Sequence, residues 1–143
     1  MSERIIIKQD RNFHVHIWGS DPRDPDSREL IEVQHLNDLS PYTMMLVGMA
    51  TCTGSVVLPY AEHHHLDLET LEIRLTYVRE EPEEGAQGRY KERIEEEMTF
   101  TGDLDSRERE KLFKIAHQCP ITRMVQRGVE VDSRRVEHSL TPD

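Results

Sequence analysis

The sequence lacks the motifs that mark several common functional classes. It has two cysteines, Cys52 and Cys119, and no Cys-x-x-Cys motif, which excludes the zinc knuckles and dithiol motifs that need closely spaced pairs. A glycine-rich phosphate loop and a Gly-x-Ser-x-Gly motif are also missing. The 18 basic residues are outnumbered by 28 acidic ones, for a net charge of -10. No nucleic-acid partner is expected, because phosphate binding needs a basic stripe.

Apolar residues are scarce as well. They make up 36% of the chain, and the mean hydropathy is -0.70. The one long apolar run, residues 40–65, is broken by Gly, Pro, Ser and Thr and ends in three histidines, so it is a poor membrane span. The N-terminus has no signal-peptide pattern. We therefore expect a soluble, cytoplasmic protein with no membrane partner, folded as a single domain over residues 1–143 with a polar tail from about residue 132.

The hydrophobic periodicity predicts an α+β fold. Residues 4–8 and 12–18 read as a hairpin, with Phe13, Val15 and Ile17 on one face. Further strands are predicted at 29–35, 71–78, 90–101 and 129–131; the segment 90–101 is rich enough in Glu that a helix is an alternative. Helices are predicted at 41–64, 105–117 and 121–126. Gly and Pro mark the loops between the predicted strands and helices.

The predicted helix over residues 41–64 is the centre of the chain. Ser40 is a candidate N-cap and Pro41 a first-turn proline. The helix is apolar nearly all round, which is typical of a helix packed on several sides. Pro59 is expected to kink it or to end it.

The two cysteines allow two interpretations. In a reducing compartment they are either free thiols or a redox pair, and unrelated buried cysteines are common. Cys119 directly precedes Pro120, so its sulfur is expected near a helix N-terminus, where a thiolate is favoured. His117 is close enough in sequence to affect that thiol.

The histidines favour a structural interpretation. His63, His64 and His65 are consecutive and fan out around a helix, so they are expected to form a solvated helix end. His14 and His16 share a strand face and with a cysteine could ligate a metal, although an exposed polar face is the simpler reading. We expect no metal and no cofactor.

Two segments together resemble the OsmC/Ohr family. Residues 40–80 (SPYTMMLVGMATCTGSVVLPYAEHHHLDLETLEIRLTYVRE) resemble its central helix and following strand. Residues 94–131 (IEEEMTFTGDLDSREREKLFKIAHQCPITRMVQRGVEV) resemble its second half, including Gly-Asp-Leu-Asp, Cys-Pro and a closing short strand. The resemblance implies an intertwined homodimer in which antiparallel sheets wrap around a pair of central helices, with the sites at the subunit interface.

The same resemblance implies a thiol-dependent peroxidase that reduces organic hydroperoxides in the oxidative stress response. Cys52 would be the reactive thiolate and Cys119 the resolving thiol, with an external dithiol as reductant. The family's arginine would correspond to Arg11. Its glutamate lies just after the proline that opens the central helix, where this sequence has Tyr42 and Thr43, whose hydroxyls could substitute as donors.

The missing glutamate keeps a second function open. A dimer of the same fold without peroxidase activity could bind a small apolar ligand at its interface, in a pocket that includes Met44, Met45 and Met49.

Overall fold

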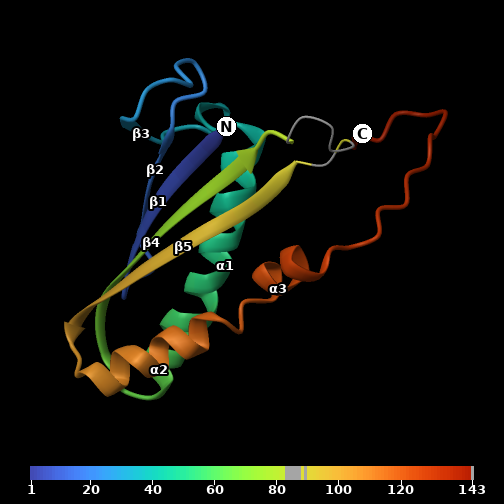
Figure 1. Ribbon diagram of the computed structural model, residues 1–143. Coiled ribbons are helices and arrows are strands. Elements are labelled where there is room, and N and C mark those ends of the chain that lie inside the picture. Colours follow the sequence, from blue (N-terminus) through green and yellow to red (C-terminus); the bar gives the residue numbers. More distant parts are fainter. Residues whose placement is uncertain (83–87, 89, 143) are drawn as a thin grey trace.

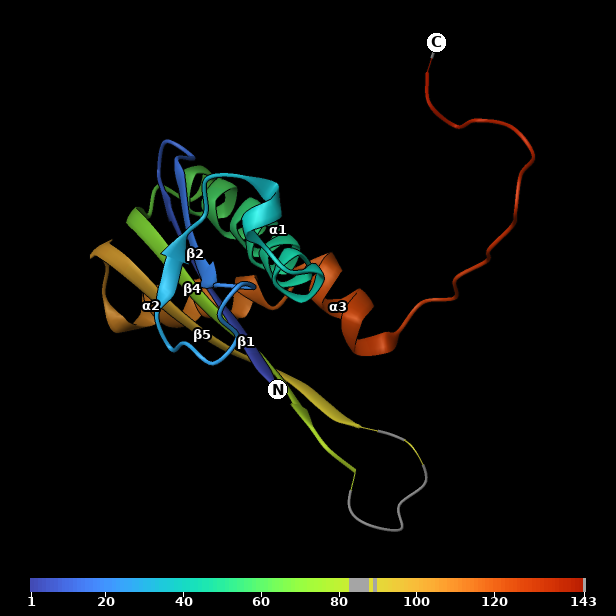
Figure 2. The same cartoon turned by 90° about the horizontal axis from the view of Figure 1, so that it is seen from above.

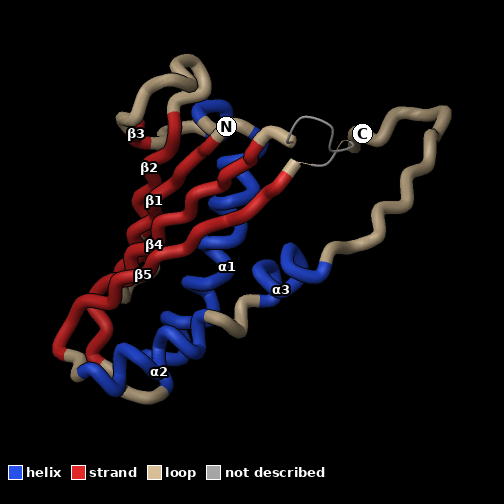
Figure 3. The backbone as a smooth tube through the Cα atoms, viewed as in Figure 1, coloured by secondary structure: helices blue, strands red, loops and turns tan. Residues whose placement is uncertain are grey.

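Five antiparallel strands form one sheet, and a long helix packs along one face of it (Figure 1). The computed structural model describes residues 1–82, 88 and 90–142. The strands lie in the order β3-β2-β1-β4-β5; their bounds are β1 Ser2–Asp10, β2 Val15–Ser20, β3 Leu30–Glu32, β4 Asp67–Glu80 and β5 Lys91–Asp103. The helices are η1 Leu36–Asp38, α1 Pro41–His63, α2 Ser106–Ala116 and α3 Pro120–Arg127. The α+β prediction is confirmed (Figure 3).

Alternating residues of β1 and β4 build the core. On β4, Leu71, Ile73 and Leu75 are fully buried and point towards α1, while their neighbours are more exposed. On β1, Ile5 and Ile7 lie on the same inner face. This period of two buries one face of the sheet. The helical alternative for residues 90–101 is wrong, because β5 pairs with β4 along almost its entire length.

The first hairpin differs from its prediction. Asp10 accepts hydrogen bonds from the backbone N–H groups of Asn12 (2.8 Å) and His14 (3.0 Å), so the turn lasts until His14 and β2 begins at Val15. Phe13 therefore sits in the turn with a φ of 63° and is 52% exposed. The expectation that Phe13 faces the core is wrong because the side chain of Asp10 stabilises a longer turn.

The ends of α1 are close to those predicted. Ser40 caps the helix by accepting a hydrogen bond from the Thr43 N–H at 3.2 Å, and Pro41 opens it. Pro59 neither ends nor interrupts the helix, which continues to His63. Pro59 and Ser55 are both exposed, so the carbonyl of Ser55 that loses its helical partner faces solvent, where water replaces the lost bond.

By length and composition, α1 is also apolar enough to cross a membrane. A core helix passes the same test, and 44% of its most apolar window is buried in this fold. Its packing against β1 and β4 accounts for its apolar character without a bilayer.

A close approach fixes the position of α1 on the sheet. At Gly54, which is buried, a Cβ atom would overlap the side-chain amide of Gln9 on β1. A larger residue would force that side chain to move. The contact influences how α1 lies on the sheet, and Cys52 stands two residues earlier in the same helix.

The C-terminal third contains the last two helices, and one strand predicted there does not form. Asp105 and Glu108 form a capping box at the start of α2, and Gly128 ends α3 with a φ of 74°. Residues 129–131 do not form a strand. Val129 and Val131 are 62% and 81% exposed, because the chain after α3 runs away from the sheet (Figure 2) and none of the described strands lies beside it to pair with.

Candidate functional site

Cys52 and Cys119 meet where α1 faces the start of α3. Cys52 lies in the middle of α1 and is half-buried, whereas Cys119 directly precedes α3 and is fully buried. The two free thiols lie close enough to shift each other's pKa. The structure therefore brings together two residues that are far apart in the sequence.

Cys119 is held by several hydrogen bonds. Its sulfur caps α3 and accepts from the backbone N–H of Thr122 at 3.5 Å. Its thiol also lies 3.8 Å from the carbonyl oxygen of Met49 on α1, to which it can donate. The buried Thr53 supplies a further side-chain contact. Cys119 is thus at a helix N-terminus, as the sequence predicts, in a setting that favours the thiolate.

The two thiols have opposite pKa shifts. Burial raises the pKa of Cys119, but hydrogen bonds from Thr122, Cys52 and Thr53 outweigh it, and the pKa falls below its usual value. Burial raises the pKa of Cys52; a hydrogen bond from the Ile121 backbone opposes this, and Cys119 adds to the rise. The pair thus loses its first proton as a unit, with the negative charge stabilised at the N-terminus of α3.

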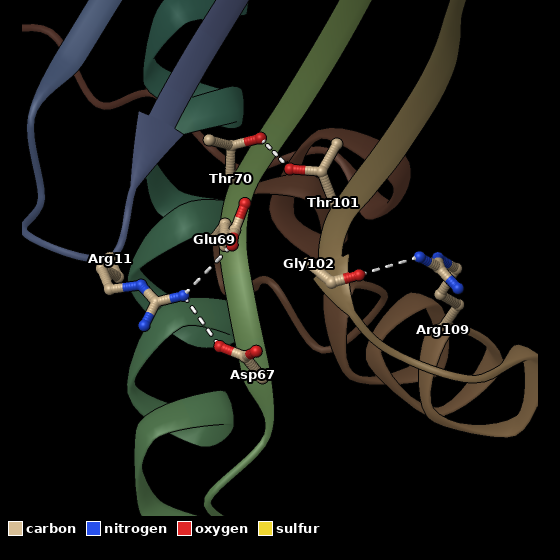
Figure 4. Close-up of polar contacts among 7 residues, drawn as sticks. All are labelled: Arg11, Asp67, Glu69, Thr70, Thr101, Gly102 and Arg109. Carbon is tan, nitrogen blue, oxygen red and sulfur yellow. Dashed lines mark hydrogen bonds and ion pairs between the residues drawn. The ribbon is translucent and has the colours of Figure 1, made fainter.

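Arg11 lies elsewhere in this chain. Its guanidinium is 2.8 Å from Asp67 and 4.0 Å from Glu69, both at the start of β4 (Figure 4). It shares a small pocket with Leu58 and Ala61, near the C-terminal end of α1. Among the residues that the structure describes, its ion pairs are with these two carboxylates, so any contact with the cysteines would have to come from a second subunit.

The start of α1 holds no carboxylate of its own, as the sequence indicates. The Thr43 hydroxyl donates to the carbonyl of Ser40 at 3.1 Å and is buried, so it does not face an incoming substrate. The Tyr42 ring stacks on Tyr77 with 4.8 Å between ring centroids, and its hydroxyl accepts from Arg79 at 3.4 Å.

A pocket of about 880 Å³ opens between the first half of α1, β5 and α3. Its apolar lining comes mainly from Pro41, Tyr42, Met45, Met49, Ile94 and Val125. Its polar groups include Glu92, Glu96 and His117. Thr122 and Met49, which both bond to Cys119, form part of the wall nearest the cysteines.

Glu96 was not identified from the sequence. One of its carboxylate oxygens is buried and has no hydrogen-bond partner among the described residues. Burial raises the pKa of this carboxyl, and the charge of His117 opposes the rise. The sequence of β5 does contain a signal for this buried carboxylate. Every second residue faces inward along the strand, and this set places Glu96 among the apolar residues Ile94, Met98 and Phe100.

Arg109 positions the segment between β5 and α2. Its guanidinium donates to the backbone carbonyls of Phe100, Gly102 and Leu104; Figure 4 shows the contact with Gly102. Near the start of β4 and the end of β5, a hydrogen bond between the hydroxyls of Thr70 and Thr101 joins the two strands (Figure 4). These contacts fix the start of α2 against the sheet, and α2 leads directly to Cys119.

The histidines do not form a metal site. His63, His64 and His65 are exposed at the end of α1, as predicted. His14 pairs with Asp10 at 3.0 Å, and His16 stacks on Trp18. Across residues 1–82, 88 and 90–142, no three His, Cys, Asp or Glu side chains gather to hold a metal ion, so His14 and His16 do not meet a cysteine in such a site.

Comparisons with known proteins identify the family and the fold. The family model described as OsmC-like protein matches residues 34–134. The chain belongs to the OsmC-like family. No curated protein matches it.

Two solved structures share the fold of this OsmC-like protein. An OsmC-like hydroperoxide resistance protein from Jannaschia sp. CCS1 is 10% identical with a TM-score of 0.57, covering 98% of this chain and 96% of that one. The organic hydroperoxide resistance protein OsmC from Legionella pneumophila, also described as a predicted redox protein and regulator of sulfide bond formation, is 18% identical with a TM-score of 0.51, covering 85% and 88%. At these identities the likeness establishes the fold.

Proposed function

We propose that this protein is a thiol-dependent peroxidase that reduces organic hydroperoxides. The observation that carries the proposal is the proximity of the thiols of Cys52 and Cys119, which shift each other's pKa, beside an apolar pocket. The family and the printed descriptions of the two solved relatives support this chemistry.

Exposure decides which thiol reacts first. Cys52 is half-buried, whereas Cys119 has no exposed surface. A hydroperoxide can reach only a sulfur with some access, so Cys52 is the reactive residue and Cys119 the resolving one. The lower pKa of Cys119 does not conflict with this order, because two thiols that lie close together titrate as a pair and can exchange a proton.

The reaction proceeds in three balanced steps. The Cys52 thiolate attacks the outer peroxide oxygen, and the O–O bond breaks. The alkoxide takes a proton and leaves as an alcohol, while Cys52 becomes a sulfenic acid. The Cys119 thiolate then attacks that sulfur, forming a disulfide while the hydroxide leaves and is protonated to water. An external dithiol reduces the disulfide by exchange and is itself oxidised.

A second subunit completes the proposal. Met44 and Met45 are 36% and 41% exposed on α1, which leaves an apolar face of the central helix uncovered. A homodimer packed on this face would cover it, and a partner's Arg11 would supply a cation to the Cys52 thiolate. We place the protein in the cytoplasm, where thiol reductants are available.

The test compares single cysteine variants. With cumene hydroperoxide and dithiothreitol, Cys52→Ser should lose turnover, and Cys119→Ser should lose disulfide formation while Cys52 still becomes a sulfenic acid that dimedone traps. If Cys52→Ser consumes peroxide as fast as the wild type, the proposed function is wrong.

The pocket favours one alternative, a dimer that binds a small apolar ligand without turnover. In that case both cysteine variants and the wild type should consume no peroxide, and an apolar molecule should be retained in native mass spectrometry.

A further inference from the structure

Thr122, in the first turn of α3, carries two hydrogen-bond donors close to Cys119. Its backbone N–H donates to the sulfur at 3.5 Å. Its side-chain oxygen is buried and has no hydrogen-bond partner among the residues that the structure describes. A buried hydroxyl without a partner is destabilising. Capping does not require it, because the sulfur of Cys119 already caps α3.

The sulfur of Cys119 is an acceptor that lies beside this hydroxyl. The side chain of Thr122 lowers the pKa of Cys119 more than the Thr122 backbone does, and more than the side chains of Cys52 and Thr53. The neutral thiol lies 3.8 Å from the carbonyl oxygen of Met49, to which it can donate its own proton. In the thiol form, therefore, the sulfur acts as a donor towards Met49 while the hydroxyl beside it stays unbonded.

Ionisation of Cys119 changes what its sulfur needs. A thiolate has no proton to give to Met49 and can only accept hydrogen bonds. Cys119 has no exposed surface, so bulk water does not solvate the charge, and a buried charge without donors is costly. A threonine hydroxyl turns freely about its C–O bond, so that of Thr122 can turn its proton towards the charged sulfur.

Thr53 of α1 is a second threonine near this sulfur, but its hydroxyl is already in use. It is fully buried and donates to the carbonyl oxygen of Met49 at 3.1 Å. A hydroxyl has one proton to donate. Thr53 would have to break its bond to Met49 before it could serve a thiolate, whereas Thr122 has no bond to break.

The titratable groups around Cys119 belong to three elements. Cys52 of α1 shifts the pKa of Cys119 directly. At the end of α2, the ring of His117 contacts the carbonyl of Phe113 at 2.7 Å, and its charge acts on Glu96 of β5. A Cys52→Ser background removes the first influence, and the other groups stay the same in every variant compared below.

We propose that Thr122 is a positioning residue of the redox site, whose hydroxyl donates to the sulfur of Cys119 whenever that sulfur carries a negative charge. The two chemical steps that this would assist rest on the proposed function. In the resolving step, the Cys119 thiolate attacks the Cys52 sulfenic acid, and the hydroxyl raises the share of Cys119 that is ionised. The accompanying loss of nucleophilicity is smaller than this gain.

The second step is the reduction of the disulfide. One thiolate of the external dithiol attacks Cys52, the more exposed sulfur. The S–S bond breaks, and Cys119 leaves with the electron pair as a thiolate, to which the Thr122 hydroxyl donates. The second thiol of the reductant then displaces Cys52 and closes the oxidised reductant. A leaving thiol with a lower pKa leaves faster.

The first experiment titrates Cys119 without any peroxide. In Cys52→Ser it is the one remaining thiol, and the ultraviolet absorbance of the thiolate follows its ionisation from neutral to alkaline pH. Adding Thr122→Val, which replaces the hydroxyl by a methyl group of similar size, should raise the midpoint by about one pH unit. Thr122→Ser, which keeps the hydroxyl, should restore the original midpoint.

Two further variants separate the hydroxyl from the packing. Thr122→Ala also lacks the hydroxyl and should raise the midpoint as Thr122→Val does, so the result does not depend on how valine packs. Thr53→Val removes the hydroxyl that is bound to Met49 and should raise the midpoint less. Circular dichroism of each variant checks that the helices are intact.

The second experiment measures the leaving step. The Cys52–Cys119 disulfide is prepared with diamide in an otherwise wild-type protein, so no peroxidase activity is needed, and its reduction by dithiothreitol is followed at pH 7. Thr122→Val should be reduced several-fold more slowly than the wild type, and Thr122→Ser at nearly the wild-type rate.

The outcomes separate this inference from the proposed function. A midpoint unchanged in Thr122→Val, or raised equally in Thr53→Val, would overturn the inference whether or not the protein is a peroxidase. A raised midpoint with unchanged reduction would overturn the leaving-group role. If both measurements agree with the inference but Cys52→Ser does not slow peroxide consumption, the peroxidase proposal fails and the role of Thr122 stands.

Discussion

The sulfur atoms of Cys52 and Cys119 lie close together but have different surroundings. Cys119 receives an N–H from the start of α3 and is fully buried, whereas Cys52 is more exposed and its pKa is raised. Part of that rise comes from Cys119 itself, through its side-chain contact and its charge. Burial is therefore the main cause of the raised pKa of Cys52, and the partner thiol raises it further.

Removal of Cys119 should make Cys52 more acidic. In Cys119→Ala the two contributions of Cys119 to the raised pKa of Cys52 disappear, so the alkylation of Cys52 by iodoacetamide should reach half its maximal rate at a lower pH than in the wild type. Mass spectrometry of the Cys52 peptide across pH 6–10 measures this, with Cys119→Ser as the more polar control. An unchanged or higher midpoint would show that the thiols do not interact.

Glu96→Gln should stabilise the protein at neutral pH. Burial raises the pKa of Glu96 above its ordinary value of 4.5, so the fold favours the protonated carboxyl. That contribution to stability is complete below pH 4.5 and is lost as the pH rises through the folded pKa. The variant should therefore have a higher urea midpoint than the wild type at pH 7 and an equal one near pH 4. An advantage of the same size at both pH values would contradict the assignment.

Individual residues of the candidate site differ in whether their surroundings could be predicted from the sequence. The cysteine pair was found because both residues stand in segments that resemble one family. Glu96 was missed because its neighbours in β5, Glu95 and Glu97, are exposed, and the three together read as one solvated acidic cluster. The surroundings of Arg11 depend on β4, which is distant in sequence, so its pairing with Asp67 was not predictable.

At the scale of elements, the approach of α1 to β1 depends on Gly54. A methyl group there would overlap the side chain of Gln9. Gly54→Ala should lower the free energy of unfolding by about 1–3 kcal/mol, the usual cost of overpacking. Urea denaturation followed by circular dichroism measures this.

Two further variants separate the clash from helix propensity. Gly48→Ala, where a Cβ atom meets nothing within 4 Å, should gain about 0.5–1 kcal/mol because alanine favours a helix. Gly54→Ala combined with Gln9→Ala should recover most of the loss. If Gly54→Ala is as stable as Gly48→Ala, the close approach is not present.

Elements with strong local signals were predicted well. The caps of α1 and α2 and the alternation in β4 are encoded by neighbouring residues. The strand at residues 129–131 failed because a strand needs a partner, and nothing local shows whether one is available. The start of β2 was misplaced because a side chain, Asp10, determines the turn.

At the scale of the whole molecule, the uncovered face of α1 is the feature that a single chain does not explain. We expect it to be the centre of a homodimer. Met44→Glu should shift the molecular mass measured by light scattering from twice 16.8 kDa to 16.8 kDa, because a buried, unpaired charge at an interface is costly.

Ser106→Glu is the matched control for that variant. It adds the same charge at an exposed position in the first turn of α2, where an acidic side chain suits the helix dipole. It should leave the mass at twice 16.8 kDa. A wild-type protein that is monomeric at all concentrations would contradict the dimer and leave the exposed methionines of α1 without a partner.

The central claim is that Cys52 and Cys119 form one redox site. The most direct measurement treats the reduced protein with one equivalent of cumene hydroperoxide, quenches it with an alkylating agent, and identifies the cross-linked peptides by mass spectrometry. The account predicts a Cys52–Cys119 disulfide within a single chain, formed at the expense of both free thiols and absent in either single variant. Recovery of both cysteines fully alkylated, with the peroxide unconsumed, would contradict it.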